Sequence, residues 1–128
     1  MREELIERFL NFAVEIYKLE DGLCKSYSGK HIYGQLFRSG TSSGANYDEA
    51  TAAESKKDFV HKMLISFKEL RESYFWLRFI EKAKLISENN AVLIALLKEN
   101  KELLNILGKA VSTTKIKWQK TLKNNGKI

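Results

Sequence analysis

Apolar side chains recur every three or four residues along most of the chain, which is the spacing of one face of an α-helix. In residues 4–25, six of them follow at spacings of 4, 3, 4, 3 and 4, and four more widen the apolar stripe. A stripe of this width is typical of a helix in a bundle, since a two-stranded coiled coil needs a narrower seam. The six positions are Leu5, Phe9, Phe12, Ile16, Leu19 and Leu23, and the flanking ones are Ile6, Leu10, Ala13 and Tyr17.

Two breaks in this pattern separate the next helices. Ser28 and Gly29 precede an expected helix at residues 30–53. Ser55 then begins the sequence Ser-Lys-Lys-Asp, which resembles a capping box and starts a further helix that runs to Lys84. Because the connection between these two helices is so short, they must lie side by side and antiparallel.

The last helix begins after the polar segment at residues 87–90 and can continue into the C-terminal tail. The chain contains no proline, and no stretch of useful length alternates apolar and polar residues as a half-buried strand would. We therefore predict an all-α, up-and-down antiparallel four-helix bundle over residues 1–114, followed by a basic C-terminal extension at residues 115–128. The apolar stripe of the last helix consists of Leu93, Leu96, Leu97, Leu104, Leu107 and Val111.

The helix expected at residues 55–84 has more apolar surface than one neighbour can cover. Four large side chains follow one another at residues 74–77, each turned 100° from the one before. A helix that is apolar on several sides is buried on several sides, so we expect contact with another subunit near Phe75, Trp76 and Phe79. The core positions expected on this helix are Phe59, Met63, Phe67, Leu70, Tyr74 and Leu77.

Small residues are concentrated in the helix at residues 30–53. Gly40 and Gly44 lie one turn apart and are flanked by Ser39 and Ser43, although glycine in a helix interior costs roughly 1 kcal/mol relative to alanine. This choice indicates that another backbone approaches closely, either within the chain or between chains. We assign both glycines to an oligomer interface.

A stripe of polar side chains runs along the same helix at spacings of 3, 4, 4 and 3. We interpret it as a polar seam, in which Ser42 and Asn46 hydrogen-bond across helices and Glu49 pairs with a basic group of the next helix or of a neighbouring subunit. An enzyme site built around Arg38, Asn46 and Glu49 is an alternative, although Arg38 and Glu49 lie about 16 Å apart along the helix. The stripe consists of Gln35, Arg38, Ser42, Asn46 and Glu49, and Ser39 adjoins it.

The positive charge of the chain is concentrated at its C-terminal end. The net charge is +6, from 22 basic and 16 acidic residues, and residues 109–128 hold six lysines and no acid. Residues 1–108 therefore carry 16 charges of each sign. A basic tail on a neutral body is typical of proteins that bind a polyanion, most often nucleic acid and sometimes a membrane surface. A tail that only aids solubility is the alternative.

Helical pitch in this tail would gather most of its lysines within about 120° of one another, opposite Trp118. A helix that packs by its tryptophan side, with lysines that are merely solvated, is the competing interpretation. If the tail binds nucleic acid, its phosphates would meet the lysines and Trp118 would stack on bases. The residues of this expected interface are Lys109, Lys115, Lys117, Lys120, Lys123, Lys127 and Trp118.

Residues that catalyse reactions or hold metals are sparse. Cys24 is the single cysteine, and His31 and His61 lack the paired carboxylate spacings that a di-metal site in a bundle requires. We therefore expect no catalytic residue, no metal and no cofactor. The longest apolar run, residues 91–97, has seven residues, against about 20 for a bilayer crossing. With no evident secretory signal, we expect a soluble protein of the cytoplasm.

A long motif in the middle of the chain resembles that of a known family. Residues 35–80 read QLFRSGTSSGANYDEATAAESKKDFVHKMLISFKELRESYFWLRFI. They resemble the signature R-S-G-T-S-x-G-A-N-x-x-E-A, followed by S-K-K-D-F, K-E and W-L, of the four-helix-bundle family named for proteins encoded in intervening sequences of bacterial 23S rRNA genes. The resemblance covers nearly the whole chain, and Ser43 stands where the family usually has an apolar residue.

The resemblance implies an up-and-down bundle that assembles as a homopentamer, and no known enzymatic activity. The chain is also similar to the accessory protein of diversity-generating retroelements, a basic pentamer that binds reverse transcriptase and nucleic acid. We therefore expect a non-enzymatic, oligomeric bundle that binds RNA or DNA through lysine-rich surfaces. The alternative is a protein-binding adaptor or scaffold without direct nucleic-acid contact, whose partner could be a reverse transcriptase.

Overall fold

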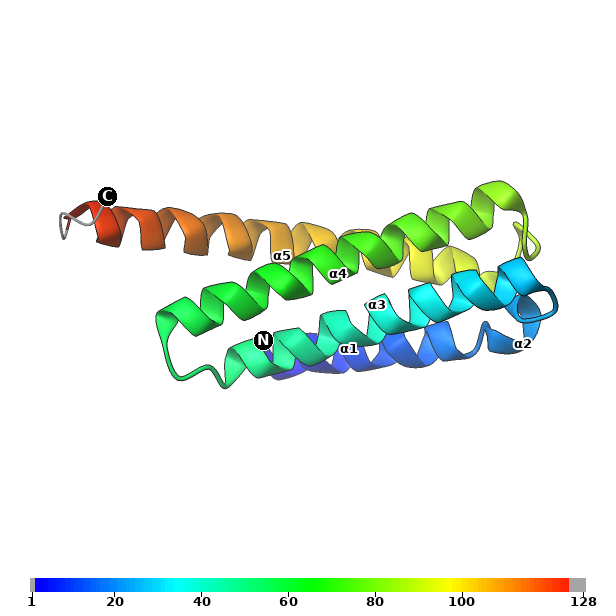
Figure 1. The fold of residues 1–128 in the computed structure, drawn as a ribbon, viewed down its shortest axis with the longest axis horizontal. Helices are drawn as coiled ribbons and strands as arrows, with labels where there is room; N and C mark the ends of the chain where they lie inside the picture. Colours follow the sequence, from blue (N-terminus) through cyan, green and yellow to red (C-terminus); the bar gives the residue numbers. More distant parts are fainter. Residues whose placement is uncertain (1, 125–128) are drawn as a thin grey trace.

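Four long helices and one short helix make up the fold (Figure 1). The computed structural model describes residues 2–124, and the side chains of residues 114–122 and 124 lie outside this description. No strand occurs among residues 2–124, so the predicted all-α, antiparallel four-helix bundle is confirmed. The elements are α1 (Arg2–Tyr17), α2 (Glu20–Leu23), α3 (Tyr27–Thr51), α4 (Lys56–Ala83) and α5 (Ala91–Asn124).

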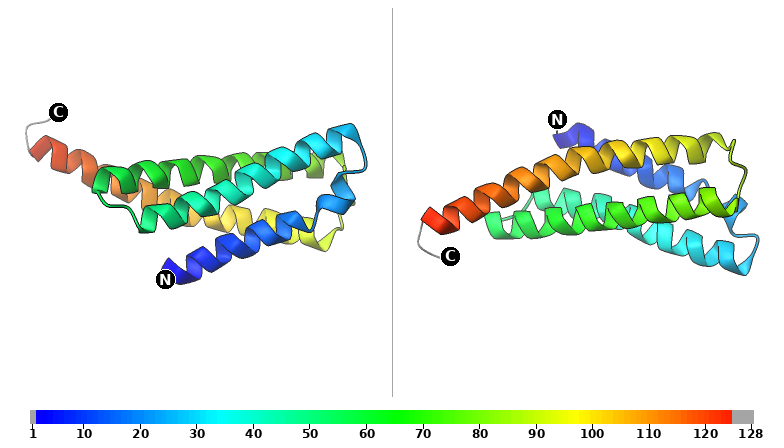
Figure 2. Two further views of the ribbon diagram at one scale, coloured as in Figure 1. Left: turned by 60° about the horizontal axis from the view of Figure 1, so that its bottom comes forward. Right: turned by 90° about the horizontal axis from the view of Figure 1, so that it is seen from above.

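The four long helices lie side by side around the bundle in the order α1, α3, α4, α5 (Figures 1 and 2). Arg8 on α1 closes the fourth side by donating two hydrogen bonds, of 2.6 and 2.9 Å, to the carboxylate of Glu99 on α5. The C-terminal part of α5 extends past the start of α4 and projects from the end of the bundle (Figure 2). No described helix combines the length and the hydropathy that crossing a bilayer would need.

Side-chain caps fix where the helices begin. The Ser55 hydroxyl accepts the Asp58 N–H at 3.0 Å, as the capping sequence predicted. The predicted break at Ser28 and Gly29 is wrong, because Ser26 caps α3 by accepting the Gly29 N–H at 3.0 Å. Gly29 is needed in this first turn, since a Cβ there would lie 1.8 Å from the Leu23 carbonyl oxygen.

The first predicted helix is also divided, because the chain turns between α1 and α2. The Leu19 N–H bonds the Ile16 carbonyl three residues back instead of four, which tightens the last turn. Leu19 and Leu23 nevertheless stay buried. The tightened turn thus keeps the apolar stripe in the core while the chain reverses toward α3.

The core side of α4 differs from the one expected. Phe59, Phe67 and Tyr74 are only half-buried, because α4 turns two serines toward its neighbours and the small side chains let the helices approach. On α5 the innermost stripe likewise includes a polar residue, Asn100, which is fully buried. The buried residues of α4 are Met63, Ser66, Leu70, Ser73, Leu77 and Ile80. Among the described side chains of α5, the buried residues are Leu93, Leu96, Asn100, Leu103, Leu107 and Val111.

Gly40 and Gly44 lie against α1 of the same chain. A Cβ on Gly40 would stand 2.3 Å from the Cδ1 of Ile16, and one on Gly44 would stand 2.9 Å from the Cβ of Phe9. Gly40 is buried within the single chain. Close packing of α1 on α3 within the chain therefore accounts for both small residues, and the assignment of the half-buried Gly44 to an oligomer interface stays a prediction.

Candidate nucleic-acid interface

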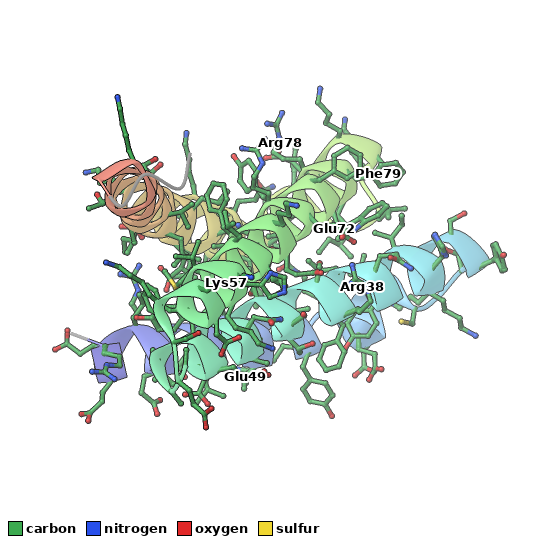
Figure 3. The ribbon with its side chains drawn as sticks, turned by 60° about the vertical axis from the view of Figure 1, so that its left-hand side comes forward. Arg38, Glu49, Lys57, Glu72, Arg78 and Phe79 are labelled. Atoms are coloured by element: carbon green, nitrogen blue, oxygen red, sulfur yellow. The ribbon has the colours of Figure 1, made fainter. Side chains whose placement is uncertain are left out.

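The polar stripe of α3 faces α4 and its charges are paired there. Arg38 donates to Glu69 at 3.0 Å and to Glu72 at 2.6 Å, and Figure 3 shows Arg38 and Glu72 where the two helices meet. Lys62 donates to Glu49 at 2.7 Å, which confirms the predicted pairing of Glu49 with the next helix. We call these five residues the α3–α4 seam.

Electrostatics inside the seam follow from these contacts. The hydrogen bonds from Arg38 and from the Trp76 indole, the latter at 3.0 Å, lower the pKa of the Glu72 carboxyl. The hydrogen bond to Glu49 raises the pKa of the Lys62 ammonium. These contacts favour the ionised forms of Glu72 and Lys62, and the ion pairs of the seam fasten α3 to α4.

The amide of Asn46 bonds within its own helix. Its Nδ2 donates to the Ser42 carbonyl at 2.9 Å and to the Ser42 hydroxyl at 3.0 Å, so the predicted cross-helix bonds of these two residues are wrong. The reason is their spacing of four residues, which places both on the same face one turn apart. Gln35 is half-buried on this stripe, and buried Ser39 donates to the Leu36 carbonyl at 3.2 Å.

The buried, uncharged hydrogen bonds between helices are made instead by residues that the sequence interpretation missed. The Ser66 hydroxyl donates to the Ser43 carbonyl at 2.6 Å, which joins α4 to α3. Asn100 on α5 donates to the Leu70 carbonyl at 3.1 Å and accepts the Ser73 hydroxyl at 2.8 Å. The available signal was the spacing, since Asn100 stands where the leucine stripe of α5 requires a core residue.

The residues of the alternative enzyme hypothesis do not form one site. Arg38 and Glu49, both on α3, form separate ion pairs with different residues of α4. In the contacts described above, Asn46 bonds only to a residue of α3. Burial raises the pKa of the half-buried Cys24 thiol, which reduces its nucleophilic thiolate fraction. Within the described residues, no three His, Cys, Asp or Glu side chains are grouped as a metal site would need.

Aromatic side chains are exposed on the last turns of α4. Phe75 and Phe79 are 60% and 41% exposed, and the half-buried ring of Trp76 packs edge-on against both. The flanking Arg78 and Lys82 are exposed as well. We call Phe75, Trp76 and Phe79 the aromatic cluster, and its exposure leaves apolar surface that the single chain does not cover.

A groove between α4 and α5 carries basic side chains. One part has a volume of about 1100 Å³ and the adjoining part about 560 Å³. Figure 3 shows Arg78 on the side of α4 away from α3. Among the side chains that the structure describes, no acidic residue lines either part, and the basic residues there are Lys68, Arg71, Arg78, Lys101 and Lys109.

Only part of the predicted lysine interface falls within the described side chains. Lys109 and Lys123 are both exposed on α5, which continues as a helix through residue 115 to Asn124. The expectation that the last helix continues into the tail is therefore confirmed. The side chains of Lys115, Lys117, Trp118 and Lys120, and all of Lys127, lie outside the described residues.

The chain is similar to a known protein family in sequence and to a crystal structure in fold. A family model described as 23S rRNA-intervening sequence protein matches residues 3–109. The chain is also similar to a crystal structure from Bacteroides thetaiotaomicron, a protein with unknown function from the S23 ribosomal protein family. That similarity has a TM-score of 0.74 and 30% sequence identity, and it covers 84% of this chain and 97% of the other. No curated protein matches the chain, and neither match indicates an enzyme family.

Proposed function

Because this chain belongs to the 23S rRNA-intervening sequence protein family, we propose that it is a non-enzymatic, oligomeric bundle of the cytoplasm that binds RNA or DNA through lysine-rich surfaces. The observation that carries this proposal is the helix that projects from the bundle. Residues 109–124 continue α5 with five lysines and no acid, and both lysines described there, Lys109 and Lys123, are exposed.

A projecting basic helix suits a polyanion for a physical reason. Lysines that neutralise phosphates release condensed counterions, and this release supplies much of the affinity for nucleic acid. Residues 1–108 carry equal numbers of positive and negative residues, so the attraction is local to the tail and its surroundings. In an oligomer several tails act together, and linked weak contacts gain affinity from their effective concentration.

Self-association is the second part of the proposal. The aromatic cluster on α4 is flanked by Arg78 and Lys82, while α1 exposes Leu10, Val14 and Tyr17, each more than 50% exposed. Helical spacing places two acidic residues, Glu3 and Glu7, on that same face of α1. An apolar, basic face of one copy therefore complements an apolar, acidic face of the next. Contacts between unlike faces give a ring, such as the expected pentamer, when the rotation from copy to copy closes.

A protein-binding adaptor is the competing function. The exposed apolar residues of α1 and α4 favour it, because contiguous apolar surface also marks sites for other proteins, such as a reverse transcriptase. The two functions differ in their dependence on salt, since apolar contacts lack the counterion release that phosphate contacts produce.

A titration of short labelled RNA and DNA, followed by fluorescence anisotropy at several salt concentrations, tests the nucleic-acid function. The intact chain should bind with a log-log salt slope of about −0.7 to −0.9 for each neutralised phosphate. Deleting residues 115–128 should flatten that slope while the bundle stays folded, since the buried stripe of α5 extends to Val111. Absence of binding at low salt would favour the adaptor, whereas equal binding by both chains would exclude the tail as the principal contact.

The mass of the intact chain tests self-association. Light scattering should give a particle larger than a dimer, and Phe79→Ser together with Leu10→Ser should reduce its mass because both remove exposed apolar contacts. Asn11→Ser is a matched control, since Asn11 is exposed and polar on α1. A persistent 14.8 kDa monomer at micromolar concentration would contradict the oligomer.

A further inference from the structure

The groove between α4 and α5 is a continuous surface that leads toward the projecting end of α5. Its two parts share Phe67, Arg71, Leu104 and Asn105, so they form one channel. Along α4 it extends from Leu64 to Arg78, but Phe75 and Arg78 at its far end adjoin the aromatic cluster. The part that stays clear of the proposed contact between copies extends from Leu64 to Tyr74, which is about 15 Å at 1.5 Å per residue. Along α5 it reaches Thr113 and includes Lys109, so the groove and the tail meet.

The basic side chains of this groove lack the partners that the α3–α4 seam has. Lys68, Arg71 and Lys101 are exposed, and among the described residues no carboxylate lies within 4.0 Å of them. Arg78 has one acidic neighbour, Glu81, at 3.4 Å. Charges of one sign gathered in a hollow attract and concentrate ions of the opposite sign, so the groove fits a ligand with several negative charges in a row.

Aromatic rings lie between these charges. Phe67 and Tyr74 line the groove and are half-buried, which leaves part of each ring open to the channel. Aromatic side chains bind nucleic acid by stacking on bases, whatever the sequence. A duplex keeps its bases stacked and paired inside, whereas an unpaired strand can present them to such rings.

We propose that the α4–α5 groove binds single-stranded nucleic acid, with Arg71 and Lys101 contacting phosphates and Phe67 stacking on a base. This inference rests on the proposed nucleic-acid function. It adds a second contact surface on the bundle itself and specifies an unpaired strand as the ligand. The strand runs along the groove and continues onto the lysines of the tail, with Lys109 belonging to both surfaces.

The test compares two variants that lose the same charge from different places. Arg71→Gln with Lys101→Gln removes two charges from the groove, and Lys25→Gln with Lys30→Gln removes two exposed lysines that do not line it, one from the turn between α2 and α3 and one from the first turn of α3. The probes are a fluorescein-labelled 20-nucleotide RNA of mixed sequence, the same sequence as DNA, and a duplex of each, titrated by anisotropy. Thermal melting of each variant confirms that it is folded.

The groove variant should bind the single strands at least tenfold more weakly, and its salt slope should be smaller by about 1.4 to 1.8, the contribution of two phosphates. The control variant should change affinity by less than threefold. Phe67→Leu, which keeps an apolar side chain, should weaken single-strand binding about fivefold or more without changing the slope. The duplexes should bind more weakly than the single strands to the intact chain.

Each other outcome has a definite meaning. If the intact chain binds but the groove and control variants are equal, the groove proposal is overturned while the tail keeps the nucleic-acid function. If the duplexes bind as well as the single strands, the unpaired ligand is wrong. A changed oligomer mass with unchanged binding would assign the groove to a contact between copies and overturn the proposal. Failure of the intact chain to bind any probe at low salt would remove both proposals together.

Discussion

The two sides of α4 use charge in opposite ways. Toward α3, Glu69 and Glu72 both meet Arg38, and Lys62 meets Glu49. Toward α5, five basic residues line a groove that, among the described side chains, no acidic residue lines. The difference shows that a polar pattern in the sequence gives charge positions but leaves open whether a charge is paired, which depends on the neighbouring helix.

The same contrast holds for the motif that distinguishes the chain most strongly. Residues 35–50 stabilise the packing of the bundle. The glycines let α1 pack closely on α3, and the charged residues form ion pairs between α3 and α4. The α4–α5 groove has no comparable motif, since its residues are ordinary lysines, arginines and aromatics. The most recognisable segment is therefore structural, and the proposed binding surface is assembled from residues that are far apart in the sequence.

Gly40→Leu should give the largest effect on the packing side of this contrast. The new side chain meets Ile16 at a position where even a Cβ would be 2.3 Å away, so we expect a loss of unfolding free energy of about 3 kcal/mol. Chemical denaturation measures it. Gly34→Ala is the control, because a Cβ there meets nothing within 4 Å, and it should stabilise the chain by up to about 1 kcal/mol. Equal stability of Gly40→Leu and the parent chain would show that α1 does not pack closely there.

Asn100→Ala should have the next largest effect. It removes both hydrogen bonds that join Asn100 to α4 and leaves a cavity in the core, at about 2 kcal/mol, while the Ser73 hydroxyl keeps the Leu70 carbonyl as an acceptor at 2.8 Å. Asn46→Ala loses bonds only to Ser42 on a half-buried face, so it should cost about 1 kcal/mol or less. Thermal or urea unfolding of both variants measures the difference. A larger cost for Asn46→Ala would reverse the roles assigned to these two residues.

The buried amide of Asn100 also shows which features of the fold can be predicted from the sequence. Periodicity predicted four antiparallel helices and the Ser55 cap correctly, because helical spacing and capping are local properties of the chain. It could not show that Asn100 meets Ser73, since that contact depends on the rotation and register of α5 against α4. It also could not choose between a contact within the chain and one between chains for Gly40, because both require a small residue.

Arg38→Gln should have the smallest effect on stability, about 0.5 to 1 kcal/mol at neutral pH, because the ion pairs are partly exposed. The pKa of Glu72 is lower in the folded chain than its ordinary value of 4.5, with Arg38 as the main cause. The resulting stabilisation is present above that ordinary value and is lost as the pH falls through the lowered one.

The stability difference between Arg38→Gln and the parent chain should therefore be largest near pH 7 and shrink below about pH 4.5. Urea unfolding at a series of pH values measures it, with Lys18→Gln as a control because its acidic partner, Glu15, lies only three residues earlier, so this pair does not join two helices. A difference that grows toward acid pH would contradict the assigned role of Arg38.

The most direct test of the opposite roles of the two sides is a paired measurement on Arg38→Gln and Arg71→Gln, each of which removes one arginine. RNA binding by anisotropy at several salt concentrations and thermal melting are recorded for both. Arg71→Gln should reduce the salt slope by about 0.7 to 0.9 with an unchanged melting temperature, whereas Arg38→Gln should lower the melting temperature and leave the slope unchanged. Equal loss of binding in both variants, or loss in Arg38→Gln alone, would contradict the division between a structural seam and a binding groove.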